Sequence, residues 1–344
     1  MGLAGRPAFS LTQFDDQQFT ANCISGASAP AMGQTRCMEN VLSRWRRELR
    51  GTFSNNSAAI PQWELDLEQG SDGGYFGPGT AAWAVHGSMT TLVAGIQSLL
   101  LQALHPGALA GVHDHSDYRS DPLGRLAGTI RWIFTVSYGD TTAAQNASAK
   151  VLRIHKYVQG TFTTNSGEDR HYGANDPDLL RWVHLAFTQA FLATHQGYGG
   201  PIPGGPDAYV ADWAVAGALM QVESPPVTVQ ELRAQLAAYT PELRYDARVA
   251  ETVSFIRNPP LPRSQQLGYK VLFAAAVATL PPEYRELLRL HTPRLGPIPL
   301  PVRCPAKAVL AVVGWSLGAT SPSEKSARTR RRRLGLESSP SNHR

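Results

Sequence analysis

The sequence predicts an all-α fold, and three observations support this class. Apolar residues recur at helical spacing in most segments between residues 88 and 319. Several of these segments begin at Asp–Pro or end at glycine, as helices commonly do. No alternating apolar run of strand length separates them. We therefore expect a single large helical domain over residues 36–319, between a poorly ordered segment, 1–35, and a disordered basic tail, 320–344.

The first predicted elements flank a glycine-rich loop. Residues 36–49 carry apolar side chains at helical spacing, and residues 68–80 hold five glycines and a proline, which predicts a loop. A long helix is expected over 88–107, with Ser88 as its N-cap and Pro106 as its stop. Because this helix is apolar nearly all round, we place it at the centre of the domain.

Three further helices follow in close succession. Asp121 and Pro122 form a typical helix start, and Gly139 follows the end of that helix. A second helix is expected over 141–160 and a third over 175–200. The later helices, also assigned from spacing and flanking prolines, are 207–220, 228–238, 243–257, 263–279, 282–291 and 306–319, with an extended connector at 292–305.

Composition and charge exclude some classes of protein. Hydrophobic residues make up 42% of the 344 residues and charged residues 17%, as in a folded domain. The net charge of +5 equals the five arginines of "RTRRRR", 328–333, so the rest of the chain has no broad basic face, and no nucleic-acid partner is expected. The three cysteines include no CxxC pair, which favours a reduced state, although a Cys23–Cys37 disulfide stays open.

The N-terminal residues have no apolar stretch of signal-peptide length, and no window reaches the roughly 20 apolar residues that a spanning helix needs. We therefore expect a cytoplasmic protein. The apolar helix 306–319 and the basic tail leave peripheral association with a membrane as a second possibility.

Three residues are the main candidates for chemistry. His155 falls with Val151 and Val158 on one helical stripe, so it is either a core histidine or an axial haem ligand. Arg125 and Thr129 stand four apart on the preceding helix and share a face. If that face points inward, Arg125 could pair with a buried anion and Thr129 could donate a hydrogen bond.

Two metal-site alternatives carry less weight. His113 and His115, with Asp114 and Asp117, could hold a metal from a loop, or could form a solvated turn. Only "EDRH", 168–171, has the Glu-x-x-His spacing of a di-iron bundle, which needs two such motifs. No phosphate-binding glycine loop is present.

Three segments together resemble one family. They are "LLLQALHPGALAGVHDHSDYRSDPLGRLAGT", "VLRIHKYVQGTF" and "HYGANDPDLLRWVHLAF", and they are similar to the domain shared by latex clearing proteins (rubber oxygenases) and MpaB-type oxygenases, over about residues 75–300. The resemblance implies a distantly globin-like helical domain that holds haem b. It also implies that His155 is the axial ligand of the haem iron and that Arg125 and Thr129 lie beside the haem.

One departure concerns the substrate. Some rubber-cleaving members carry a lysine three residues after the arginine, where this chain has Gly128. The resemblance therefore predicts a haem-dependent oxygenase that uses O₂ on an apolar, unsaturated small molecule or lipid, with cleavage of a carbon–carbon double bond as one outcome. The alternatives are a non-catalytic haem carrier or sensor and a membrane-peripheral, lipid-associated protein.

Overall fold

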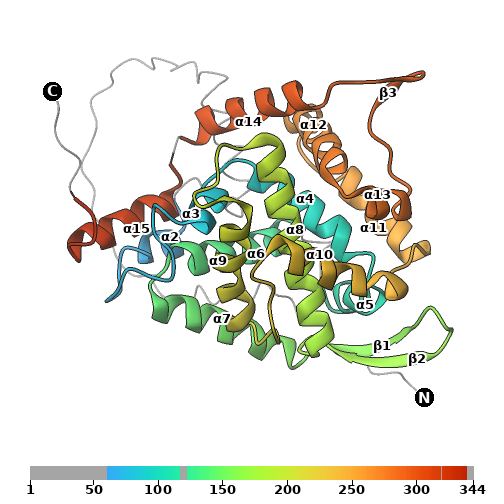
Figure 1. The fold of residues 1–344 in the computed structure, drawn as a ribbon, viewed down its shortest axis with the longest axis horizontal. Coiled ribbons are helices and arrows are strands. Elements are labelled where there is room, and N and C mark those ends of the chain that lie inside the picture. Colours follow the sequence, from blue (N-terminus) through green and yellow to red (C-terminus); the bar gives the residue numbers. More distant parts are fainter. Residues whose placement is uncertain (1–59, 117–121, 319, 339–344) are drawn as a thin grey trace, which may run out of the picture.

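The computed structural model describes residues 60–116, 122–318 and 320–338, and for residues 122–126 it describes the backbone alone (Figure 1). Within these ranges the chain is a single all-α domain with two small two-stranded sheets, which confirms the predicted fold class. The segment predicted as poorly ordered, 1–35, and the helix predicted over 36–49 lie outside the described residues.

The helices and strands follow one another along the chain in this order: α2 (Gln62–Asp66), α3 (Ala81–His86), α4 (Thr91–Gln102), α5 (Pro106–His115), α6 (Pro122–Tyr138), α7 (Thr141–His155), β1 (Gln159–Thr163), β2 (Asp169–Gly173), α8 (Pro177–Tyr198), α9 (Gly205–Leu219), α10 (Val229–Ala238), the 3₁₀ helix η1 (Thr240–Glu242), α11 (Ala247–Arg257), α12 (Arg263–Thr279), α13 (Pro282–Leu287), β3 (Arg294–Leu295), β4 (Ile298–Pro299), α14 (Arg303–Leu317) and α15 (Pro322–Arg333).

Helix α4 lies at the centre of the domain, as predicted for the segment 88–107. It packs along α8 and also contacts α12 and α11 (Figure 1). Val93, Leu100 and Leu101 of this helix are fully buried. The core around it holds most of the large apolar side chains of the chain, including Trp182 and Trp213. Burial of this apolar surface is the main source of stability for such a fold.

The predicted helix over 88–107 is divided into two. Helix α4 ends at Gln102, and Pro106 begins α5 at an angle of 107° to α4. A proline lacks the amide hydrogen that a helix interior needs, but it fits the first helical position. His105 caps α5, because its Nδ1 accepts hydrogen bonds from the amides of Gly107 (3.2 Å) and Ala108 (3.3 Å).

The predicted helix over 141–160 is too long. Helix α7 ends at His155, and the antiparallel hairpin β1–β2 follows, with Gly160 opposite Tyr172. Most residues of the two strands are exposed and only Phe162 and Tyr172 are buried, so the sequence lacks the alternating pattern of a half-buried strand. His155 is therefore the last residue of α7, and Val158 lies beyond the helix. The sequence pattern predicts both residues on one helical stripe.

The prediction of a disordered tail from residue 320 is wrong for residues 322–333, which form helix α15. Ser321 caps this helix by accepting a hydrogen bond from the amide of Glu324 at 3.1 Å. The mean hydropathy of the segment gives no sign of burial, yet Arg330 is completely buried. The helix packs on α2 and α6.

Within the described residues, no single helix is long and apolar enough to cross a membrane. Only the bent pair α4–α5 meets that length and composition when its two helices are taken together.

Candidate functional site

Helices α6 and α7 form an antiparallel hairpin that brings the candidate residues to one end. The two helices pack together and are connected at Gly139–Asp140, where the Asp140 carboxylate caps α7 by accepting from the Ala143 amide at 2.8 Å. Arg125 lies 13 positions before the end of α6, and His155 lies 14 positions after the start of α7. At a rise of about 1.5 Å per residue, both lie about 20 Å from the connection and are therefore level with each other.

A hydrogen bond shows which faces of the two helices meet. The Trp132 indole nitrogen on α6 donates to the Ser148 hydroxyl on α7 at 3.1 Å. Trp132 lies seven residues after Arg125 and three after Thr129, so all three share one helical face. Ser148 lies seven residues before His155 and shares its face in the same way. The face of α6 that carries Arg125 and Thr129 is therefore turned toward the face of α7 that carries His155.

This end of the hairpin is accessible. Thr129 is exposed and His155 is half-buried. Gly128, on the same helix, is exposed, and no atom of the described residues lies within 4 Å of the position that a Cβ would occupy. An imidazole nitrogen is a haem-iron ligand, and guanidinium and hydroxyl groups suit the polar edge of a porphyrin. The residue types at this exposed end of the hairpin thus suit a haem group.

The other end of α6 is anchored by a buried histidine that the sequence analysis missed. His86 Nδ1 lies 2.6 Å from the Ser137 hydroxyl of α6, and its Nε2 lies 3.2 Å from the Tyr209 hydroxyl of α9. The ring also packs edge-on against Trp213, with 4.3 Å between centroids. Burial lowers the pKa of His86 to about 3, and the neighbouring His195 adds to this effect. The ring is therefore neutral and serves as a hydrogen-bonding bridge between α3, α6 and α9.

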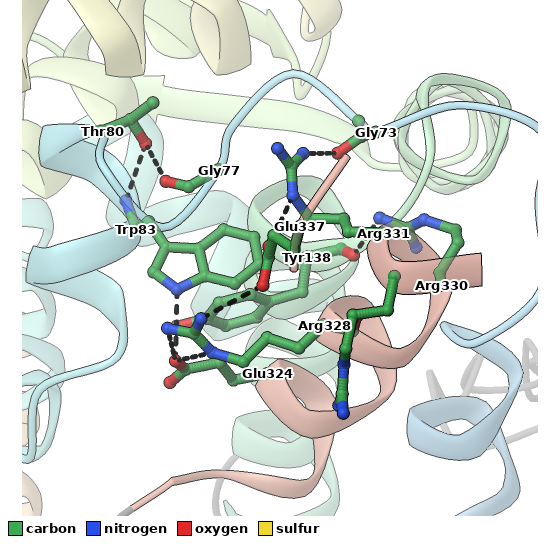
Figure 2. Close-up of polar contacts among 12 residues, drawn as sticks. Gly73, Gly77, Thr80, Trp83, Tyr138, Glu324, Arg328, Arg330, Arg331 and Glu337 are labelled. Carbon is green, nitrogen blue, oxygen red and sulfur yellow. Dashed lines mark hydrogen bonds and ion pairs between the residues drawn. The ribbon is translucent and has the colours of Figure 1, made fainter. Parts of the chain in front are cut away.

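The last carbonyl of α6 is held by Arg330 of α15. Its guanidinium donates to the carbonyl oxygen of Tyr138 at 2.8 Å (Figure 2). It also donates to the carbonyl oxygens of Asp72 (3.1 Å) and Leu67. Burial lowers the pKa of Arg330, while the carboxylates of Asp140 and Asp72 act in the opposite direction. The arginine predicted to be part of a solvated tail thus joins α15 to the end of α6 and to the loop before α3.

The neighbouring side chains of α15 contact the same region. Glu324 accepts a hydrogen bond from the Trp83 indole at 3.3 Å and forms an ion pair with Arg328 at 2.9 Å (Figure 2). Arg331 donates to the Gly73 carbonyl at 2.7 Å. A run of arginines usually indicates a solvated surface, so the arginines themselves do not predict these contacts of α15. The signal that the sequence does contain is the helix-capping pattern "SPSE" at 321–324.

The alternative metal sites find no support. His113 and His115 lie in the last turn of α5, not in a loop, and His115 Nε2 donates to the Gln159 carbonyl at 2.9 Å. Glu168 and His171 belong to the exposed β1–β2 hairpin, not to a helix. Throughout the part of the chain that the structure describes, no group of three or more His, Cys, Asp and Glu side chains could hold a metal ion. Asp117 lies outside that part.

Comparison with protein families gives a decisive match. A family model described as "ER-bound oxygenase mpaB/B'/Rubber oxygenase, catalytic domain" matches residues 83–315, which is more than half of the 344-residue chain. The chain belongs to this family. The match runs from within α3 to within α14 and so contains the α6–α7 hairpin, whereas α15 lies beyond it. No curated protein and no solved structure matched the chain.

Membership of this family confirms the resemblance noted in the sequence and makes the domain an oxygenase catalytic domain. An oxygenase uses O₂ and a small-molecule substrate. The positions of Arg125, Thr129 and His155 at one end of the hairpin are consistent with a site there, but the match does not assign roles to individual residues.

Proposed function

We propose that this protein is a haem b-dependent oxygenase whose iron is bound by His155. The observation that carries the proposal is the antiparallel α6–α7 hairpin, which sets His155 level with Arg125 and turns their helical faces toward each other. Membership of an oxygenase family supports the same conclusion. Haem, when bound, supplies the iron and the redox chemistry that activates O₂.

In this proposal the side chains have separate tasks. His155 coordinates the iron through one imidazole nitrogen and is held by the last turn of α7. Arg125 pairs with a propionate, and Thr129, one turn further along the same face, donates a hydrogen bond from its hydroxyl beside the haem. The anchors at Ser137, Tyr138 and Trp132 fix α6, so that its site-bearing half keeps a constant position relative to α7.

We infer that the substrate is an apolar, unsaturated small molecule or lipid, with cleavage of its carbon–carbon double bond as the expected outcome. The protein's contribution is to position the double bond. Gly128 supports a substrate other than rubber, because no side chain at this position can act as the lysine does in some rubber-cleaving relatives. The open space beside Gly128 leaves room for a ligand there.

The test is the absorption spectrum of the purified protein after addition of haem. We expect a Soret band in the wild type, its loss or a clear shift in His155→Ala, and no change in the control His171→Ala, which removes an exposed histidine of β2. An unchanged band in His155→Ala would exclude this histidine as the ligand, and no band in the wild type would exclude the haem proposal. Haem binding without O₂ consumption in the presence of alkenes would instead support a carrier or sensor.

A further inference from the structure

We propose that the outer face of α14, together with the tip of the β3–β4 hairpin, docks this protein on an anionic lipid bilayer. This surface differs from the basic tail, whose Arg330 and Arg331 bind carbonyl groups within the protein. It is also independent of the proposed haem chemistry, so either proposal can fail without the other.

Helix α14 is apolar on both sides. Ala306, Leu310 and Val313 are buried against the domain. On the opposite side Val312 and Trp315 are 51% and 62% exposed, next to the small, exposed Cys304, Ala308 and Ala311, and the exposed Arg303 and Lys307 flank them. A surface helix that exposes apolar side chains opposite its buried side is typical of a helix that contacts a membrane or a partner, and α14 lies at the surface (Figure 1). Exposed tryptophan is characteristic of the membrane–water interface.

The apolar surface continues beyond α14. The tip of the β3–β4 hairpin exposes Leu295 (71%) and Ile298 (64%), and on α12 Leu267 is 76% exposed. Helix α12 packs against α14, with Gly268 close to Val309. Figure 1 shows the hairpin extending outward from the same end of the domain. Apolar patches of this kind on an otherwise soluble domain mark sites of contact with a membrane or a partner.

The charges near this surface favour a membrane over a protein partner. No Asp or Glu occurs between Glu286 and Glu324, or between Glu251 and Glu283, so all charged residues of these segments are basic. The exposed ones include Arg294 on the hairpin, Arg303 and Lys307 on α14, and Arg263 and Lys270 on α12. Segments that expose apolar and basic side chains and contain no acidic residue complement an anionic bilayer.

Two hollows beside α14 suit lipid headgroups. One, of about 390 Å³, is lined by Arg303, Leu300 and Tyr198, among others. The other, of about 350 Å³, is lined by Lys307, Met89 and the same Tyr198, among others. Neither has an acidic residue in its lining. A lipid phosphate bound in either hollow would lie beside one of these two basic side chains.

The test is co-sedimentation of the full-length protein with vesicles of phosphatidylcholine alone and with vesicles that also contain phosphatidylglycerol. We expect binding only to the anionic vesicles, and weaker binding at high salt. Lys307→Glu should weaken the partition coefficient by about 25-fold, because it changes the charge by two and each charge near the surface contributes about fivefold. Trp315→Ser should weaken it by about tenfold through lost apolar contact.

Matched controls keep the test specific. Val227→Ser replaces an apolar residue of similar exposure (47%) near α10, and Arg233→Glu reverses an exposed charge on α10. Both should bind vesicles like the wild type. All four variants change exposed side chains, so their melting temperatures should match that of the wild type.

A second measurement follows the surface directly. Cys304 is exposed on α14 and can carry a polarity-sensitive fluorophore once the other two cysteines are replaced by serine. The fluorescence of this label should increase when anionic vesicles are added. No binding to anionic vesicles, or equal binding by Trp315→Ser, Lys307→Glu and the controls, overturns the proposal. A dimer in solution that Trp315→Ser dissociates, without vesicle binding, would assign this face to a second copy of the chain.

Discussion

Replacement of Arg330 by methionine should destabilise the protein strongly, although it changes only one residue of an arginine run. The guanidinium donates to three backbone carbonyls, and its side chain is completely buried. Methionine keeps most of the aliphatic stem but leaves these carbonyls without their donor. Each buried unsatisfied polar group costs about 1–3 kcal/mol, so we expect a loss of about 4 kcal/mol in the free energy of unfolding. That is a large part of the roughly 5–15 kcal/mol typical of a domain.

Urea denaturation followed by circular dichroism measures this loss, and the melting temperature should fall by about 8 °C. Arg332→Met is the matched control, because Arg332 is half-exposed and donates only to carbonyl and hydroxyl groups of its own helix. It should cost less than about 1 kcal/mol. If the two variants lose equal stability, the three carbonyl contacts of Arg330 do not hold α15 in place and the reasoning is refuted.

Two further predictions concern pH and backbone conformation. Burial lowers the pKa of His86 from 6.5 to about 3 and that of His184 from 6.5 to about 4 in the folded state. At a pH between these lowered values and 6.5, the two histidines are therefore protonated in the unfolded state and neutral in the folded state. The free energy of unfolding should therefore fall as the pH decreases from 7 to 5, by up to about 2 kcal/mol for each histidine, and His184→Gln should have a shallower pH dependence in urea titrations. Gly74→Ala should cost about 3 kcal/mol, because Gly74 has φ of 75° and a Cβ would lie 2.2 Å from a backbone carbonyl oxygen. Gly79→Ala, where nothing lies within 4 Å of an added Cβ, should be nearly neutral in the same thermal melts.

Local signals were sufficient for the helical class and for most helix positions. The helices predicted at 228–238 and 263–279 correspond to α10 and α12 within one residue at each end. Helical periodicity and capping residues act over a few positions, so they can be recognised without knowledge of the tertiary structure. The spacing of Arg125 and Thr129 on one helical face is a local property of the same kind.

Elements whose stability depends on distant contacts were not predictable. The β1–β2 hairpin is mostly exposed, and its two buried aromatic residues, Phe162 and Tyr172, pack against Ala110 and Leu179. The sequence pattern predicts a helix stop at Pro106, whereas this proline starts α5 in a new direction. A proline allows both outcomes locally, and packing of the next helix decides between them.

The sequence by itself determined the all-α class, the family and the helical face shared by Arg125 and Thr129, because periodicity, caps and ordered motifs are written in neighbouring residues. Only the tertiary structure decided that His155 lies level with Arg125 across an antiparallel hairpin, and that Arg330 is buried in the core. Both depend on which distant backbone carbonyls and helical faces meet, and residue types alone do not specify those contacts.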